Sequence, residues 1–325
     1  MSHTSLKENM IKNFLIAIAL TMVSVASSAQ QTISIAWPYS MSHGTTALMF
    51  PLLEEANRSQ SQYNFILESK PGAQGQLALG HMNQLPASRM AVIAPDFVQL
   101  AADGKIREDD YRYLVGLGDF CFAIWNKHSD SEKGLAGLKG TGEIVLANVG
   151  WGNAGHLVAL ELASKYNLTV KNVVFKSNFE GLVNLTQNGG VTQVQESVKA
   201  FDSLKSQAVV VAKPLAVTCS TRRKEMPNVR TMAEQGITTS GPWHIIIANK
   251  EMPVETQQSI TSILNRALIA LGEDKILEIS NLHPLVFQKN KDVDAYYKKK
   301  STAQKELLKK YQPIIDADRG FSEKK

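Results

Sequence analysis

Short apolar segments of strand length alternate with longer amphipathic segments along most of the chain. The first pair is a strand at 32–37 and a helix at 45–59, whose apolar residues fall at helical spacing: Leu48, Leu52, Leu53 and Ala56. Further strand and helix pairs follow at 63–67 with 75–84 and at 143–147 with 155–166. Such alternation predicts βαβ units, mainly parallel sheets and an α/β fold.

Two apolar stretches, at 113–125 and 243–248, indicate places where the chain crosses between lobes. We therefore expect a discontinuous first lobe made of residues 30–124 and 246–325, and a second lobe made of residues 125–245. The two crossings would form a hinge, and a terminal helix at 293–311 would pack along the first lobe. A chain of 325 residues is long enough for two such lobes.

Residues 1–29 have the features of a secretory signal peptide. Lys7 and Lys12 precede an apolar run at 14–26, which is shorter than the roughly 20 residues needed to span a bilayer. Small residues at 27–29 predict cleavage after Ala29 and a mature protein outside the cytoplasm. The alternatives are an uncleaved anchor and a buried helix.

The charge balance is modestly positive. Removing residues 1–29 removes Lys7, Lys12 and Glu8, a net charge of +1, so that the net charge falls from +5 to +4. This balance suits an anionic ligand. The lysines at 298–300 and 309–310 predict a solvated helix face, and without interleaved aromatics they do not predict a nucleic-acid groove.

Cys121 and Cys219 both lie in apolar, strand-like runs. We expect two small buried thiols there, although an oxidising compartment would also permit a disulfide. The sequence contains no CxxC, no HExxH and no His/Cys cluster at metal-ligand spacing, so we expect no metal site and no cofactor.

Three loops follow predicted strands, where α/β proteins bind their ligands and helix N-termini attract anions. The first supplies hydroxyls, an imidazole and a glycine from Tyr39, Ser40, Ser42, His43, Gly44, Thr45 and Thr46. The second is a turn with Gly72, Ala73, Gln74 and Gly75. The third opens a helix with Gly150, Gly152, Asn153, Ala154 and His156.

The residues of each loop can also be interpreted as structural, with no ligand bound. Ser42 or Thr45 could simply cap a helix, and the Pro71-Gly72 dipeptide is common in ordinary turns. His156 could be a hydrogen-bonded structural histidine. The glycines at 150, 152 and 155 fit G-x-G-x-x-G, but no acidic residue about 20 positions later supports dinucleotide binding.

Several of these motifs resemble those of the TctC/Bug family, the substrate-binding proteins of tripartite tricarboxylate transporters. The segment 70–75 (KPGAQG) is similar to the family's N-x-P-G-A-x-G turn, with Ser69 in place of the asparagine. The segment 150–156 is similar to its G-x-G-S-x-x-H motif, with Asn153 in place of the serine. Arg222 with the segment 227–236 is similar to its R…P-D-V-P-T-x-x-E-x-G stretch. The resemblance covers most of the mature chain.

The first loop departs from the family pattern. Pro38 and Tyr39 are kept, but Ser42 and His43 stand where the family has two glycines, and Thr46 stands where it has an aspartate. Side chains at 42 and 43 would crowd a site where the family uses bare backbone. Because the aspartate is absent and His43 is present, the cleft would be less negative, which would still favour an anionic ligand.

The resemblance implies a two-lobed type II periplasmic-binding-protein fold, periplasmic location and capture of a small carboxylate for membrane permease subunits. We expect a monomer that closes like a clamshell, with the loops above and the helix start at Ser177 and Asn178 donating to the carboxylate. One alternative is a ligand-binding co-receptor for a sensor kinase. Another is an exported hydrolase, which the absence of a G-x-S-x-G elbow disfavours.

Overall fold

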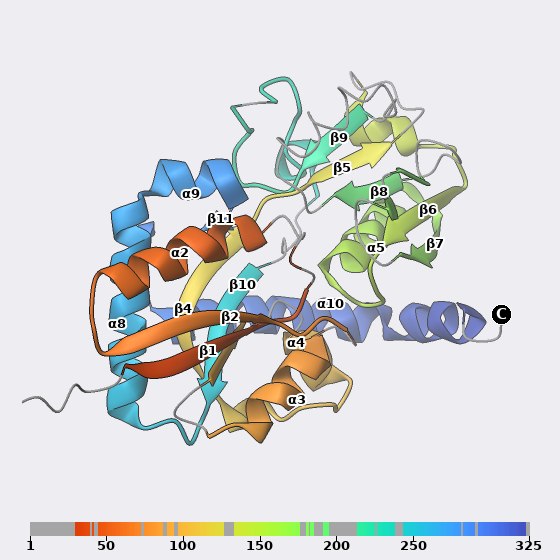
Figure 1. Cartoon of the computed structure of the whole chain (residues 1–325). Helices are drawn as coiled ribbons and strands as arrows, with labels where there is room; N and C mark the ends of the chain where they lie inside the picture. Colours follow the sequence, from red (N-terminus) through yellow and green to blue (C-terminus); the bar gives the residue numbers. More distant parts are fainter. Residues whose placement is uncertain are drawn as a thin grey trace, which may run out of the picture.

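The computed structural model describes residues 30–39, 41, 45–72, 75–86, 90–93, 97–126, 133–175, 180–181, 183–184, 191–194, 213–224, 226–237, 243–280, 282–289 and 292–322. The predicted signal peptide lies outside them. Two sheets with helices packed around them form two lobes, as the sequence predicted (Figure 1).

The first lobe contains the larger sheet, with strand order β11-β4-β10-β3-β1-β2. Its strands are β1 (Gln31–Trp37), β2 (Tyr63–Ser69), β3 (Met90–Ile93), β4 (Tyr111–Phe120), β10 (Trp243–Asn249) and β11 (Leu282–His283). Its helices are α2 (Thr46–Arg58), α3 (Gln76–Gln84), α4 (Phe97–Ala102), α8 (Val254–Leu271) and α9 (Glu273–Ser280). The apolar residues of α2 recur at helical spacing because they form the buried face of the helix: Leu48, Met49, Leu52, Leu53 and Ala56.

The second lobe contains the smaller sheet, with strand order β7-β6-β8-β5-β9. Its elements are β5 (Ala123–Asn126), β6 (Glu143–Asn148), α5 (Ala154–Tyr166), β7 (Thr169–Val174), β8 (Val191–Val194) and β9 (Lys213–Val217). Short 3₁₀ turns lie in both lobes: η3 (Glu108–Asp110), η4 (Gly134–Leu138), η5 (Ala233–Gln235) and η6 (Leu285–Phe287).

The expectation of mainly parallel sheets was wrong. The β1–β2, β1–β3, β6–β7 and β6–β8 pairs are parallel, as βαβ units require. The strands next to the crossings pair antiparallel instead: β10 with β3 and β4, β11 with β4, and β5 with β8 and β9. The chain leaves the first lobe through β4 and returns through β10, so these neighbours run in opposite directions.

The prediction of two free thiols was also wrong. Cys121 directly follows β4 and Cys219 follows β9, and the two form a disulfide with their Cα atoms 4.9 Å apart. Beside it, the Thr218 amide donates to the Phe122 carbonyl at 2.9 Å, and the Phe122 amide donates to Thr218 Oγ1 at 3.1 Å. The disulfide therefore joins the first crossing to the chain just after β9, 98 residues later in the sequence.

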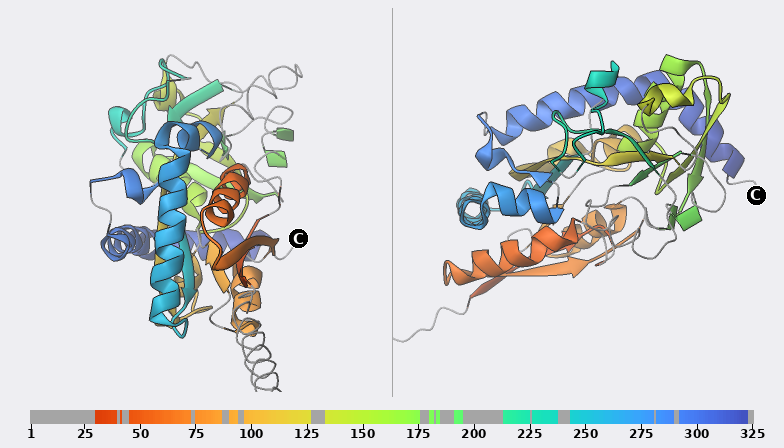
Figure 2. Two further views of the ribbon diagram at one scale, coloured as in Figure 1. Left: turned by 60° about the vertical axis from the view of Figure 1, so that its left-hand side comes forward. Right: turned by 90° about the horizontal axis from the view of Figure 1, so that it is seen from above.

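The terminal helix α10 (Val293–Ser322) is longer than the sequence pattern predicted. It packs along the first lobe, against α4 and β4, and then continues to α5 of the second lobe (Figures 1 and 2). In the second half of α10, Lys310 Nζ and the Tyr311 hydroxyl each donate to Glu161 Oε1 on α5, at 2.8 and 2.5 Å. Within the described ranges, neither α10 nor any other helix is long and apolar enough to cross a membrane.

Candidate functional site

The first two predicted loops lie side by side at the carboxyl ends of β1 and β2. Ser69 Oγ donates to the Tyr39 carbonyl at 2.9 Å, and the Tyr39 ring packs edge-on against Trp37. Gly75 takes a φ of +91° as it opens α3, and a Cβ there would lie 3.4 Å from the Pro38 side chain. The two loops therefore form one surface.

Of the other predicted site residues in the first lobe, some are buried and some lie outside the described residues. Thr45 and Thr46 are buried at the start of α2, where Thr45 makes no side-chain capping bond. Gly72 also has a positive φ, and its carbonyl accepts from the Gly75 amide at 3.0 Å. The remaining members lie outside the described residues: Ser40, Ser42, His43, Gly44, Ala73 and Gln74.

An acid occupies the end of β2, next to these loops. Glu68 accepts hydrogen bonds from the Ser34 hydroxyl and from His81 Nε2, the latter at 3.0 Å, and Lys70 lies 3.5 Å away. The Ser34 hydrogen bond contributes most to lowering the pKa of Glu68, and His81 and Lys70 also lower it. Lys70 is thus already paired with an anion of the chain.

In the second lobe, buried amide side chains hold the third loop. Asn148 Nδ2 donates to the Gly150 carbonyl at 2.8 Å and to Asn153 Oδ1 at 2.9 Å. Asn172 Nδ2 on β7 donates to the same carbonyl at 3.0 Å. Asn153 caps α5 by accepting from the His156 amide at 3.0 Å. The loop has a fixed shape because every one of these side chains is buried.

His156 is fully buried and contacts the backbone of the third loop. The Gly152 amide donates to its Nδ1 at 3.1 Å, and its Nε2 lies 3.8 Å from Asp318 Oδ2 on α10. Burial, assisted by the positive charge of Arg319, lowers the pKa of His156 to about 4, so the imidazole is neutral near pH 7. This placement gives His156 a structural role in the loop.

The third loop also touches the first lobe. Gly152 has a φ of +67°, and a Cβ there would lie 2.5 Å from Oε1 of the fully buried Gln99 on α4. Leu157 and Leu160 of α5 pack in one cluster with Phe97 and Leu100 of α4. The loop therefore sits where the two lobes meet, whereas Ser177 and Asn178 lie outside the described residues.

One backbone donor of the third loop is available to a ligand. In the part of the chain that the structure describes, the amide of Ala154, the first residue of α5, has no hydrogen-bond acceptor. The N-terminus of a 13-residue helix attracts a negative charge to this position.

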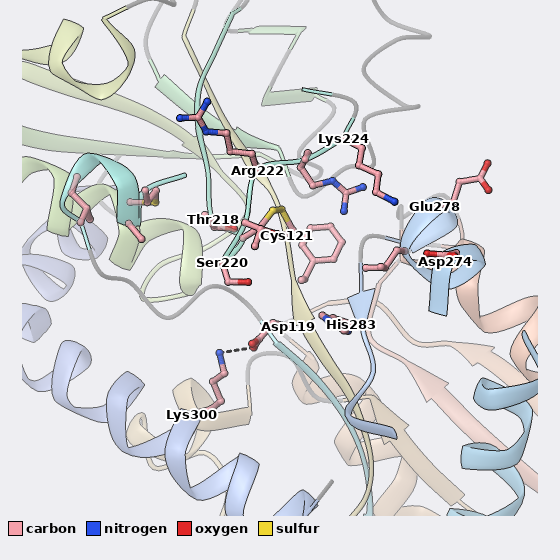
Figure 3. Close-up of a pocket in the computed structure, with 18 residues that line it drawn as sticks. Asp119, Cys121, Thr218, Ser220, Arg222, Lys224, Asp274, Glu278, His283 and Lys300 are labelled. Carbon is pink, nitrogen blue, oxygen red and sulfur yellow. Dashed lines mark ion pairs between the residues drawn. A yellow bond between two sulfur atoms is a disulfide. The ribbon is translucent and has the colours of Figure 1, made fainter. Parts of the chain in front are cut away.

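A separate cavity of about 660 Å³ lies beside the hinge (Figure 3). Residues of α9, β11, α10 and the chain after β9 line it, together with Phe120 and the Cys121–Cys219 disulfide. Lys300 pairs with Asp119 at its edge, and Lys224 lies on the side of Asp274 and Glu278. Of the predicted site residues that the structure describes, none lines this cavity.

The segment 227–236, which carries one family motif, has a structural role beside this cavity. The Thr231 hydroxyl accepts from the Glu234 amide at 3.0 Å, and Glu234 Oε2 accepts from the Thr231 amide at 2.7 Å. This reciprocal pair is a capping box. Arg222 Nε donates to both Glu234 carboxylate oxygens at 2.9 Å, and this interaction fixes the segment from outside.

Comparisons with known proteins bear on the fold. No sequence family and no curated protein matches the chain. Solved structures do match: the periplasmic binding protein BugD has a TM-score of 0.70 at 18% identity, covering 86% of this chain and 97% of BugD. MatC from Rhodopseudomonas palustris with bound malate has a TM-score of 0.65 at 16% identity, covering 87% and 98%. An R. palustris protein with adipate has a TM-score of 0.67 at 17% identity, covering 86% and 96%.

The chain has the fold of the TctC/Bug-type periplasmic binding proteins. The two-lobed architecture expected from the sequence is thus confirmed, and the structural neighbours of the chain include a periplasmic binding protein and a TctC solute-binding protein.

Sequence reasoning missed several residues that shape the site. Asn148, Asn172 and Gln99 are ordinary polar residues in the sequence, and only their burial reveals them. Asn148 carried one signal, since an amide at the end of a predicted strand precedes a glycine turn. Nothing local marked Gln99 or Asp318.

Proposed function

We propose that this protein is a divergent TctC/Bug-family solute-binding protein that binds a small carboxylate, an organic acid or an acidic amino acid, between its lobes. It would be exported to the periplasm through residues 1–29, act as a monomer without catalysis, and deliver its ligand to the permease subunits of a tripartite tricarboxylate-type transporter.

The match over nearly the full length of carboxylate-bound neighbours carries this proposal. The malate-bound and adipate-bound structures are covered to 98% and 96% of their own chains. The charge of the mature chain and the open amide at the start of α5 are consistent with an anionic ligand.

In the proposed complex, a carboxylate lies between the surface of Tyr39 and Gly75 on the first lobe and the Gly150–Ala154 loop on the second. The Ala154 amide donates to it, and the charge-assisted bond is worth about 1.5–3 kcal/mol. The sequence also predicts His43, Gln74 and Asn178 as ligand contacts, and these three lie outside the described residues. Only the closed arrangement would make both sets of contacts.

The direct test is ligand-dependent thermal stability of residues 30–325 against a panel of organic acids and acidic amino acids, including malate and adipate. A ligand present at one hundred times its Kd is expected to stabilise the protein by about 2.7 kcal/mol. Amide derivatives of each hit, which lack the carboxylate charge, are the matched ligands and should bind at least about tenfold more weakly. Absence of stabilisation by every acid would refute the proposal.

A backbone variant tests the Ala154 donor alone. Proline is favoured at the first position of a helix, and the extended conformation of Asn153, with φ −71° and ψ 171°, is compatible with a following proline. Ala154→Pro is therefore expected to fold normally and to lose about tenfold or more in carboxylate affinity. Val254→Pro makes the same change at the exposed first residue of α8 and should leave affinity unchanged.

A further inference from the structure

The end of α10 places a carboxylate against the histidine that supports the third loop. Asp318 Oδ2 and His156 Nε2 lie 3.8 Å apart, and both atoms are buried without another hydrogen-bond partner among the described residues. A buried donor or acceptor left unpaired costs free energy, so a donor and an acceptor that face each other form a natural pair. A small rotation of the Asp318 side chain or one bridging water spans this separation.

The hydrogen bond on the other side of the ring determines which nitrogen carries the proton. Nδ1 accepts from the Gly152 amide at 3.1 Å, and therefore it carries no proton. A neutral imidazole then holds its proton on Nε2, the nitrogen that faces Asp318. The direction of donation runs from the Gly152 amide to the ring, and from the ring to the carboxylate.

The backbone amide of Asn172 hydrogen-bonds to the Asp318 carboxylate, but Asp318 Oδ2 has no other hydrogen-bond partner among the described residues and is available for this task. Its neighbour Arg319 directs its guanidinium to Asp103 Oδ2, at 3.6 Å, and Asp103 Oδ1 accepts from Gln99 at 2.9 Å. Asp318 itself is only 17% exposed, and His156 is fully buried. Among the described residues, Asp318 and Arg319 are the charged groups that act on the imidazole, and Arg319 is itself paired with Asp103.

We propose that Asp318 is a positioning residue for the ligand loop: by accepting from His156 Nε2–H, it keeps Nδ1 free to hold the Gly152 amide. The last turns of α10, a helix packed mainly on the first lobe, thereby set the backbone of a loop on the second. The importance of this loop for binding rests on the proposed function, whereas the chain Asp318–His156–Gly152 does not.

The intact protein provides the first test. Spectra of the ¹⁵N-labelled imidazole near pH 7 should show His156 as a single tautomer, with Nδ1 unprotonated and a slowly exchanging Nε2–H. A proton on Nδ1 would overturn the proposal without any substitution.

Substitutions provide the second test, with hydrogen exchange of the Gly152 amide as the measurement. Asp318→Ala should mix the His156 tautomers and speed this exchange about tenfold, while Asp318→Asn keeps an acceptor and should stay within about twofold of the wild type. Asp316→Ala is the matched control, because Asp316 is an exposed carboxylate on the same helix that accepts from Gln312 at 2.8 Å. An unchanged Gly152 amide in Asp318→Ala, equal effects in Asp316→Ala, or no rescue by Asp318→Asn would each overturn it.

Binding gives a third readout, with malate as the probe. Asp318→Ala should weaken malate binding about tenfold, and Asp318→Asn should restore it. If the wild type bound neither malate nor any other acid while the tautomer and exchange results held, the proposed function would fail and the positioning role would stand.

Discussion

The hinge side of the lobe junction, defined by Cys121, Cys219 and the cavity between α9 and the chain after β9, contrasts with its helix side, where α10 and α4 meet α5. The hinge side has a covalent bond, a cavity of about 660 Å³ and charged groups that are largely exposed. The helix side has no covalent tie among the described residues, and its polar groups, including Gln99, Asn148 and His156, are buried.

The two sides of the junction therefore constrain the lobes in different ways: one limits the distance between segments, and the other fixes the orientation of a loop. A disulfide limits how far two segments can move apart but says little about the orientation of nearby loops. Buried hydrogen bonds fix orientation, because each unpaired group would cost about 1–3 kcal/mol. Exposed pairs such as Arg222–Glu234 contribute little by comparison. The helix side is thus where the geometry of the third loop is determined.

The largest expected effect is on the hinge side. Replacing both cysteines (Cys121→Ser with Cys219→Ser) removes a link across 98 residues and should lower the free energy of unfolding by about 2–5 kcal/mol, because the unfolded chain regains the freedom of a long loop. Urea unfolding under oxidising conditions measures this. Wild type unfolded with a reductant should match the double variant, and a loss below about 1 kcal/mol would show that the link is not a stabilising one.

Next in size is the buried amide network of the helix side. Asn148→Ala removes two donors, to the Gly150 carbonyl and to Asn153, and should cost about 2–4 kcal/mol, because the partners stay buried. Chemical unfolding measures it, with the exposed Asn228→Ala as control within about 0.5 kcal/mol. Equal losses in the two variants would show that the buried amide of Asn148 stabilises the protein no more than an exposed one does.

A pH effect follows from His156, whose pKa is lowered to about 4 in the fold from an ordinary value of 6.5. Between these values the unfolded chain binds a proton that the folded chain does not. Stability from the neutral imidazole is therefore complete above about pH 6.5 and falls by up to about 3 kcal/mol toward pH 4. Burial raises the pKa of Asp318, so this carboxyl group makes the folded protein more stable as the pH falls. Its effect opposes that of His156 and reduces the net dependence of the free energy of unfolding on pH.

Unfolding in urea across this pH range measures the effect, and His156→Gln isolates it. The variant should lose stability less steeply than the wild type between pH 6.5 and 4. Parallel curves for the two proteins would contradict a buried neutral imidazole.

The smallest expected effect compares two glycines of positive φ. Gly140→Ala, with φ +81° and open space around it, carries backbone strain alone, about 1 kcal/mol. Gly152→Ala, with φ +67°, adds a contact with Gln99 and should cost about 1–3 kcal/mol. Gln99→Ala in the Gly152→Ala background should recover the difference. Equal costs at both glycines would show that the loop does not press against the first lobe.

The sequence by itself determined the alternating elements, the two lobes and the positions of the three loops. Helix and strand periodicity are local properties, so α2 could be predicted from the spacing of its leucines and Asn153 from its place before a helix. The resemblance of the 150–156 segment to a family motif also located a loop that the structure places at the lobe junction.

Only the tertiary structure decided the antiparallel crossings, the Cys121–Cys219 bond and the contacts of Gly152 with Gln99 and of His156 with Asp318. These pairs are far apart along the chain, and no local pattern relates one member to the other. Their proximity results from how the lobes and α10 pack, and packing depends on the shape of whole surfaces rather than on the order of residues within one segment.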